Sequence, residues 1–330
     1  MIRGYELLHE IGKGTYGKVM RARKRGSRYR TVALKFMRDT PLARREVEIV
    51  RRLSCPNVLG ILEAFTHGEM RVMAMWHMIT DLQTIIRQEV LSAGQVKRLT
   101  TDMLCGLHYL HEEARVVHRD LKPCNLLVNS RGVLHIADFG LARALHDDKG
   151  GGDVPPPMSG HTVTMWYRAP EVFLGSTSYG TAIDLWSAGC VVVEMLLREP
   201  LFKAETDVDL LGKIFHLLGV PTEATWPGYT RLPLCARYGF SARHPCAEPP
   251  DVDWGGIFRE GPVEIDEGEM RALGDMVGHL VCCDPAKRWD AITTGHTEYL
   301  MDGVPAVDHT DIPLPPPPEA QIVPRKRKAL

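Results

Sequence analysis

Residues 118–143 read HRDLKPCNLLVNSRGVLHIADFGLAR, and this stretch carries most of the information about the fold and the chemistry of the chain. Apolar runs at residues 126–128 and 133–136 flank a polar turn, NSRG, at residues 129–132. β-forming residues on either side of a turn rich in Asn, Ser and Gly are typical of two short paired strands. We therefore predict a hairpin at the centre of the stretch.

The predicted hairpin places four polar side chains near one another. It would bring Asp138 up beside a loop that carries Asp120, Lys122 and Asn125. Carboxylate and amide oxygens suit a hard divalent cation such as Mg²⁺, and a nearby lysine suits a phosphate. A phosphate and its cation are therefore the expected ligands of this part of the chain.

The pattern HRDxKxxN followed by DFG resembles the catalytic loop and the metal-binding motif of protein kinases. The resemblance implies an α+β, bilobal kinase fold, with a small β-rich N-lobe and a larger, mainly helical C-lobe, and ATP and Mg²⁺ as cofactors. Asp120 would orient the substrate hydroxyl and accept its proton, Lys122 would neutralise developing charge, and Asn125 and Asp138 would hold Mg²⁺. A solvated hairpin with scattered charges would not explain two intact motifs at the usual separation.

The composition argues against several other classes of protein. A formal net charge of −1 over 330 residues is not that of a basic nucleic-acid binder, and we expect no nucleic-acid partner. No apolar run is long enough to span a bilayer and no signal peptide opens the chain, so we expect no membrane association. The eight cysteines include no CxxC pair, which favours buried reduced thiols over disulfides or a zinc site.

A glycine-rich stretch near the start, GKGTYGKV at residues 12–19, lies between two predicted strands. Glycines leave backbone amides free to approach phosphate oxygens. Dinucleotide-binding folds share the GxGxxG string, but there a helix follows, whereas VMRAR at residues 19–23 continues as a strand. The kinase resemblance assigns nucleotide binding to Ile11, Gly12, Lys13, Gly14, Thr15, Tyr16, Gly17, Lys18, Val19, Ala33, Lys35, Met75, Trp76, Met78, Asp81 and Leu127.

Lys35 interrupts an apolar, β-rich run, VALKF, at residues 32–36. It is either a surface lysine of an edge strand or, by the kinase resemblance, the residue that pairs with the ATP phosphates and with a helical glutamate. Pro41 can start that helix, and apolar residues follow at helical spacing. Residues 41–46 resemble the PSTAIRE-type helix of cyclin-dependent kinases, which makes Glu46 the expected partner of Lys35 and Glu48 its rival.

The connection between Lys35 and this helix is several residues shorter than in most members of that family. In the cyclin-dependent kinase family, a cyclin normally binds this region. The sequence therefore does not decide whether the protein has a cyclin-type activator. The catalytic assignments do not depend on this question.

The segment between DFG and the APE at residues 169–171 resembles a kinase activation segment. Counting back from Trp166, Ser159 takes the position of the activating phosphothreonine of cyclin-dependent kinases, with Thr162 as an alternative acceptor. The resemblance assigns the pocket for this phosphate to Arg45, Arg119 and Arg143. Three guanidinium groups that converge without an anion would repel one another, so we expect a phosphorylated residue to bind there.

Other residues take regulatory or supporting roles in the same resemblance. Thr164 would steady the catalytic aspartate and lysine, and Thr15 and Tyr16 would be inhibitory phosphosites above the nucleotide. Asp184 lies in an apolar helix predicted at residues 181–197 and must be hydrogen-bonded there; in kinases it braces the catalytic loop. A further helix is predicted at residues 95–112, and Arg288 is expected to pair with Glu171.

The sequence WYRAPE at residues 166–171 resembles the proline-directed kinases. This implies transfer of the ATP γ-phosphate to Ser or Thr followed by Pro in protein substrates, in cell-cycle or transcription control, including activation of other kinases. The nearest branch is the one that holds the cyclin-dependent-kinase-activating kinases and the ciliary cell-cycle-related kinase. That ciliary kinase and a pseudokinase scaffold are the alternatives.

We predict three parts: an N-lobe at 1–78, a C-lobe at 79–302 and a tail at 303–330. The proline-rich stretch at 313–318 would be an extended linker, and PRKRK at 324–328 is a candidate nuclear-import signal. The expected location is the nucleus, with the cytoplasm as the alternative.

Overall fold

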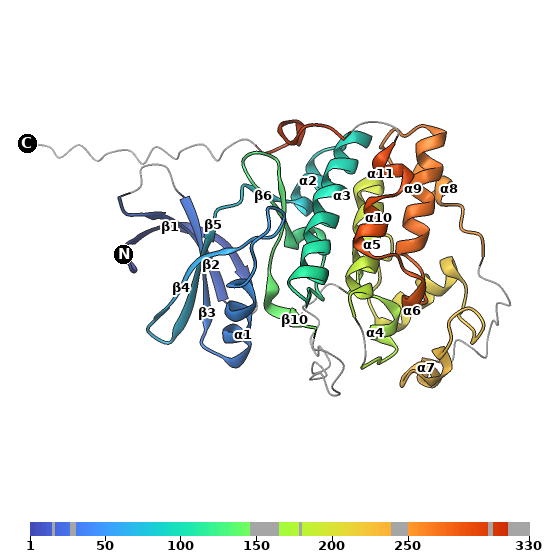
Figure 1. Ribbon diagram of the computed structural model, residues 1–330, viewed down its shortest axis with the longest axis horizontal. Coiled ribbons are helices and arrows are strands. Elements are labelled where there is room, and N and C mark those ends of the chain that lie inside the picture. The colour runs from blue at the N-terminus through green and yellow to red at the C-terminus, as the bar shows by residue number, and fades with distance from the viewer. Residues whose placement is uncertain are drawn as a thin grey trace, which may run out of the picture.

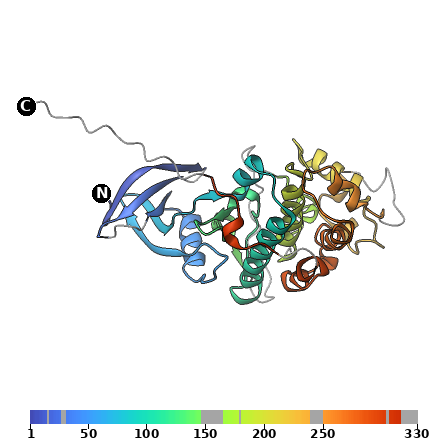
Figure 2. The same ribbon diagram turned by 90° about the horizontal axis from the view of Figure 1, so that it is seen from above.

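The computed structural model describes residues 1–14, 17–26, 31–145, 165–177, 180–238, 250–302 and 306–315. Figure 1 shows a β-rich lobe at one end of the molecule and a larger helical lobe at the other, and Figure 2 shows the same division from above. This bilobal α+β arrangement confirms the fold class predicted from the sequence. The predicted boundary near residue 78 falls just after the last strand of the β-rich lobe.

The β-rich lobe is a five-stranded antiparallel sheet with the order β1-β2-β3-β5-β4. Its strands are β1 (Tyr5–Gly14), β2 (Gly17–Lys24), β3 (Thr31–Arg38), β4 (Ile61–His67) and β5 (Met70–Trp76). Tyr5, Leu34, Phe65, Val72 and Ala74 are buried in a small core of their own. The two strands predicted on either side of the glycine-rich stretch are therefore part of a sheet with its own core.

Helix α1 (Pro41–Val50) follows β3 after only Asp39 and Thr40. Pro41 occupies its first turn, and the Thr40 hydroxyl caps it by accepting a hydrogen bond from Ala43 N at 3.2 Å. Val47 packs with buried residues of β3 and β5. The short connection predicted from the sequence is therefore a helix cap that follows directly from the strand.

The helical lobe is built around two long helices, α3 (Ala93–His108) and α5 (Ala182–Leu197). The other helices are α2 (Leu82–Gln88), α4 (Pro170–Phe173), α6 (Asp207–Leu218), α7 (Cys235–Tyr238), α8 (Trp254–Arg259), α9 (Glu267–Leu280), α10 (Ala291–Gly295) and α11 (Glu298–Met301). One large core joins them, with Trp186 of α5 fully buried in it. No helix in the described part of the chain is long and apolar enough to cross a membrane.

Short strands lie between the two lobes. The predicted hairpin is present as β8 (Leu126–Val128) and β9 (Leu134–Ile136), with β6 (Thr80–Asp81) on the other side of β8. A second pair joins β7 (Val116–Val117) to β10 (Arg143–Ala144). The two ends of the stretch at 118–143 are thus fixed by strands, and the polar residues lie between them.

Two predictions need correction. Cys190 and Cys235 are buried, but Cys105 and Cys124 are exposed, so burial does not hold for every thiol. The thiols in the described residues are free, as expected. The proline-rich linker starts later than residue 313, because Leu314 still packs on the core of the helical lobe.

Candidate active site

Asp184 of α5 stabilises the catalytic loop through hydrogen bonds to the loop backbone. This carboxylate is fully buried and accepts hydrogen bonds from the backbone N–H groups of His118 and Arg119, both at 2.8 Å. His111 Nε2 lies 2.9 Å from Oδ2, the same oxygen that accepts from His118 N. These donors outweigh burial and hold the pKa of Asp184 below its usual value. Arg119 has a left-handed backbone (φ 73°), a strained conformation that this brace stabilises.

The next polar residues of the loop, Asp120, Lys122 and Asn125, form one cluster. Lys122 Nζ lies 2.8 and 3.0 Å from the two carboxylate oxygens of Asp120. The amide of Asn125 donates to the Asp120 carbonyl at 2.7 Å and to its carboxylate at 3.0 Å. The sequence prediction that these three side chains share one loop is therefore correct, and Asp120 is fixed by both neighbours.

Asp138 also has a left-handed backbone (φ 64°), and the preceding residue, Ala137, donates its N–H to the Asn125 carbonyl of this loop at 2.9 Å. Lys35 Nζ from β3 lies 2.7 Å from Asp138 Oδ1 and 2.7 Å from Glu46 Oε1 on α1. Burial alone would lower the pKa of Lys35, but these two carboxylates raise it above the usual value. The alternative of a surface lysine is excluded, and Glu48, the rival partner, is exposed.

The residues present fit a magnesium ion. Asp138 Oδ2 has no hydrogen-bond partner among the described residues, and the hydrogen bonds that Asn125 makes to Asp120 come from its nitrogen. A carboxylate oxygen is thus left for a hard cation, together with an amide oxygen whose one contact among the described residues is a long hydrogen bond, 3.9 Å, from Cys124 Sγ. Asp138 and Asn125 are the residues that would hold it.

The predicted nucleotide residues lie mainly on the sheet and in the hinge, the connection between the two lobes at residues 71–81. Val19 of β2 is paired with Lys35 and Ala33 with Met75, so all four lie at adjacent positions of the sheet. Ala33 is buried, Ile11 is exposed, and Leu127 lies on β8. Thr15 and Tyr16 lie outside the described residues.

Gly17 shows why the loop between β1 and β2 needs glycine at that position. A Cβ atom built there would lie 1.7 Å from the carbonyl oxygen of Phe36 in β3. No other residue fits without moving a strand. Gly12, Lys13 and Gly14 are in β1, and Lys18 of β2 extends over the Phe36 ring.

The hinge offers backbone groups to a planar base. Among the described residues, the N–H and C=O groups of Met78 make no backbone hydrogen bond, as an adenine-binding position requires. Trp76 is 42% exposed beside it. Burial, together with the charge of Arg21, lowers the pKa of His77 to about 4. Asp81 accepts a hydrogen bond from Thr84 N and caps α2, so its carboxylate has a structural role as well.

Three arginines predicted to bind a phosphate come from different elements. Arg45 lies on α1, Arg119 in the catalytic loop and Arg143 on β10, and all three are half-buried and have partners. Ser159, Thr162 and Thr164 lie outside the described residues, so their predicted roles stay predictions.

The substrate side of the site is held to the helical lobe. Arg288 makes a two-pronged ion pair with Glu171, at 2.6 and 2.8 Å, as predicted. Trp166 Nε1 donates to the Ala204 carbonyl at 2.7 Å, and Arg168 stacks on the Phe173 ring. These contacts fix the segment that leads into α4.

Sequence reasoning missed two groups of residues. Asp39 accepts hydrogen bonds from both Arg44 and Arg71 and so fixes the two-residue connection before α1. Asp102 of α3 pairs with His309, which follows the last helix and packs against α3. Neither belongs to a recognisable motif, and the partners are distant in sequence.

Comparison with known proteins is consistent with this geometry. The model of the protein kinase domain matches residues 5–300, so the chain belongs to the protein kinase family. Kinases of this family use ATP and Mg²⁺.

The relatives narrow the family further. Cyclin-dependent kinase 7 of Xenopus laevis is 38% identical over 241 residues, which cover 69% of this chain and 66% of the relative. Cyclin-dependent kinase G-2 of Oryza sativa subsp. japonica is 36% identical over 309 residues, which cover 90% of this chain but 41% of the relative. A chain from the crystal structure of the yeast RNA Pol II CTD kinase CTDK-1 complex superposes with a TM-score of 0.79 and 25% identity, over 94% of this chain and 97% of that one. The chain is thus a member of the cyclin-dependent kinase family.

Proposed function

We propose that this protein transfers the γ-phosphoryl group of ATP to a serine or threonine hydroxyl of protein substrates, with a preference for a following proline. The observation that carries the proposal is the joint presence of two charge clusters: Lys35 with Glu46 and Asp138, and Asp120 with Lys122 and Asn125. Phosphoryl transfer depends mainly on placement and electrostatics, and these clusters supply both.

Each cluster has a distinct task in this proposal. Lys35, held by Glu46, binds the α- and β-phosphates, while Asp120 orients the substrate hydroxyl and accepts its proton. Lys122, 2.8 Å from Asp120, offsets the negative charge that develops on the transferred group. Mg²⁺ held by Asp138 and Asn125 supplies charge neutralisation on the phosphate oxygens.

The preference for proline rests on the resemblance of residues 166–171 to the proline-directed kinases. The anchored positions of Trp166 and of Arg168 support it, because a fixed segment can present a fixed pocket. The names of the relatives, a cyclin-dependent kinase and an RNA Pol II CTD kinase, support a role in cell-cycle or transcription control, whereas activation of other kinases rests on the resemblance described for the sequence. A nuclear location is part of the proposal; its candidate signal at residues 324–328 lies outside the described residues.

A cyclin-type protein is the proposed activator, since the relatives are named cyclin-dependent kinases. In this proposal the partner is not needed to form the ion pair between β3 and α1. The ion pair between Lys35 and Glu46 is already formed, and Asp39 anchors the connection to α1 through Arg44 and Arg71. We therefore propose basal activity in the chain alone and stimulation by a partner that contacts α1.

The test uses the purified full chain with MgATP and two peptides that differ only in Ser-Pro against Ser-Ala. A cyclin-dependent kinase and an RNA polymerase II C-terminal repeat peptide serve as protein-derived substrates. Transfer to Ser-Pro at least roughly tenfold faster than to Ser-Ala supports the proposal. Equal transfer to both would remove the proline preference, and ATP binding without transfer to any substrate would favour a pseudokinase scaffold.

A further inference from the structure

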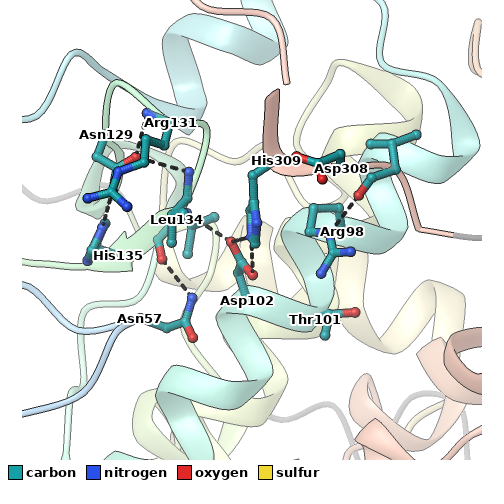
Figure 3. Close-up of polar contacts among 12 residues, drawn as sticks. Asn57, Arg98, Thr101, Asp102, Asn129, Arg131, Leu134, His135, Asp308 and His309 are labelled. Carbon is teal, nitrogen blue, oxygen red and sulfur yellow. Dashed lines mark hydrogen bonds and ion pairs between the residues drawn. The ribbon is translucent and has the colours of Figure 1, made fainter. Parts of the chain in front are cut away.

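The chain returns to the catalytic region after the last helix. We call residues 306–315 the tail segment; it lies across the N-terminal part of α3 and the turn between β8 and β9 (Figure 3). Arg98 Nε of α3 donates to the Val307 carbonyl at 2.8 Å, and Gln95 Nε2 donates to the Asp311 carbonyl at 2.6 Å. Ile312 is buried, with 3% of its surface exposed. The tail segment is therefore a packed part of the fold.

Asp102 of α3 joins the tail segment to the hairpin. His309 Nε2 lies 3.0 Å from both of its carboxylate oxygens, and the backbone N–H of Leu134 in β9 donates to the same carboxylate at 2.9 Å. The carboxylate can only accept, so Nε2 of His309 carries the proton. Asp102 is only 5% exposed, and a buried charge of this kind requires such partners.

A glycine in the hairpin turn makes the close approach of the tail segment geometrically feasible. Gly132 has φ +83°, and a Cβ atom there would lie 1.8 Å from the His309 carbonyl oxygen and 3.2 Å from Ile312 Cβ. Asn129 fixes the turn from within, because its Oδ1 accepts from the backbone N–H groups of Arg131 and Val133. The turn and the tail segment therefore fit each other closely.

The hairpin that the tail segment contacts carries part of the nucleotide site. Leu134 pairs with Val128, the neighbour of Leu127, and β9 leads through Ala137 to Asp138. We propose that His309 is a positioning residue for nucleotide binding. Through Asp102 and Leu134 it fixes the strand pair that places Leu127 under the base and Asp138 beside the phosphates. This inference rests on the nucleotide binding that is part of the proposed function. It does not depend on which protein substrates are phosphorylated.

A second attachment keeps the hairpin folded without His309. Asn57 donates to the Leu134 carbonyl at 3.1 Å, and its own carbonyl accepts from Ile136 N at 2.8 Å. Loss of His309 should therefore loosen the hairpin and leave it paired. The expected effect is on ligand affinity more than on folding.

The test compares His309→Ala with Thr310→Ala in the full chain. Thr310 is the matched control, because it is exposed on the same segment and its hydrogen bonds go to Asp308. We expect His309→Ala to weaken the equilibrium binding of MgATP roughly fivefold, about the effect of one lost hydrogen bond, and Thr310→Ala to leave it unchanged. His309→Gln, whose amide can still donate to Asp102, should restore most of the affinity.

Two further readouts separate positioning from general stabilisation. Hydrogen exchange at Leu134 N should accelerate in His309→Ala at temperatures well below unfolding, and the KM for ATP should rise while kcat changes less. Asp102→Asn combined with His309→Ala should be no weaker in ATP binding than the poorer single variant. Equal ATP affinity in His309→Ala and Thr310→Ala, or a lowered Tm with unchanged affinity, would overturn the proposal.

Discussion

At the scale of single residues, the catalytic loop depends on one buried acceptor. The Asp184 carboxylate accepts hydrogen bonds from the backbone N–H groups of both His118 and Arg119. Arg119 has a left-handed backbone at this contact. Such strain persists only where the surroundings hold it in place.

Asp184→Asn turns one of the acceptor oxygens into a donor that faces other donors. We expect a loss of about 1–3 kcal/mol in the free energy of unfolding and a fall in kcat of roughly tenfold or more, because Asp120 follows directly on the loop. Urea denaturation and steady-state kinetics measure the two effects. Asp207→Asn, at the exposed start of α6, is the control and should change neither by much.

The pair of Glu171 and Arg288 makes a separate prediction. Both side chains are buried, so Arg288→Met leaves an uncompensated carboxylate and should cost about 3–5 kcal/mol of unfolding free energy. The double variant with Glu171→Leu removes both charges and should be less destabilised than Arg288→Met alone. An Arg288→Met protein as stable as the unmodified chain would refute this account.

The contacts of single residues could be predicted from the sequence where a motif names them. Glu46 was the expected partner of Lys35, and Asp120, Lys122, Asn125 and Asp138 lie as expected. Asp39 and Asp102 could not be found in this way, because their partners are fixed only by the fold and carry no local pattern.

At the scale of elements, the contact between α5 and the end of α9 leaves no room for a side chain at Gly189. A Cβ atom there would lie 2.6 Å from Val281 Cγ2 and 2.9 Å from Leu280 Cβ. Gly189→Ala should therefore destabilise the protein by about 1–3 kcal/mol through overpacking. Gly212→Ala on α6 meets no atom within 4 Å and should be neutral or stabilising by up to about 1 kcal/mol. Thermal unfolding of the two variants tests the contrast, and equal shifts would contradict it.

The predicted helices and strands agree with the observed ones to within a few residues, and the main difference has a functional consequence. A single helix was predicted at residues 95–112, but α3 ends at His108 and a π-helical turn covers Tyr109–Glu113. This turn brings His111 to 2.9 Å from Asp184. Apolar periodicity records which face is buried and does not reveal a local change of hydrogen-bond spacing.

At the scale of the whole molecule, the two lobes meet at the hinge, where His77 is held neutral. Its folded pKa of about 4 lies below the usual 6.5, owing to burial and to the nearby Arg21 and His9. Between these values the unfolded chain binds a proton that the folded chain excludes, so the contribution to stability is complete above pH 6.5 and is lost as pH falls towards 4.

His77→Phe removes this titration. The unfolding free energy of the unmodified chain should therefore fall more steeply between pH 6.5 and 4 than that of the variant. Guanidinium denaturation at several pH values gives both curves, and the difference between them cancels the other titrating groups. Parallel curves would show that His77 is not held neutral by the fold.

The overall architecture could be predicted because two motifs imply a whole kinase fold. The packing of the tail segment could not, since it depends on a contact between Asp102 and His309 that are 207 residues apart. Proline-rich composition suggested a linker, but Leu314 and Ile312 are anchored by a surface that only the folded chain presents.

The central claim is phosphoryl transfer by machinery that the chain assembles by itself. The most direct measurement is the rate of phosphate transfer from MgATP to a Ser-Pro peptide by the purified chain and by Asp120→Asn, with ATP affinity measured for both. The account predicts transfer by the unmodified chain, a loss of roughly 10²–10⁴-fold in Asp120→Asn, and similar ATP affinity in the two. Transfer at the same rate by both proteins, or by neither although both bind ATP, would contradict it.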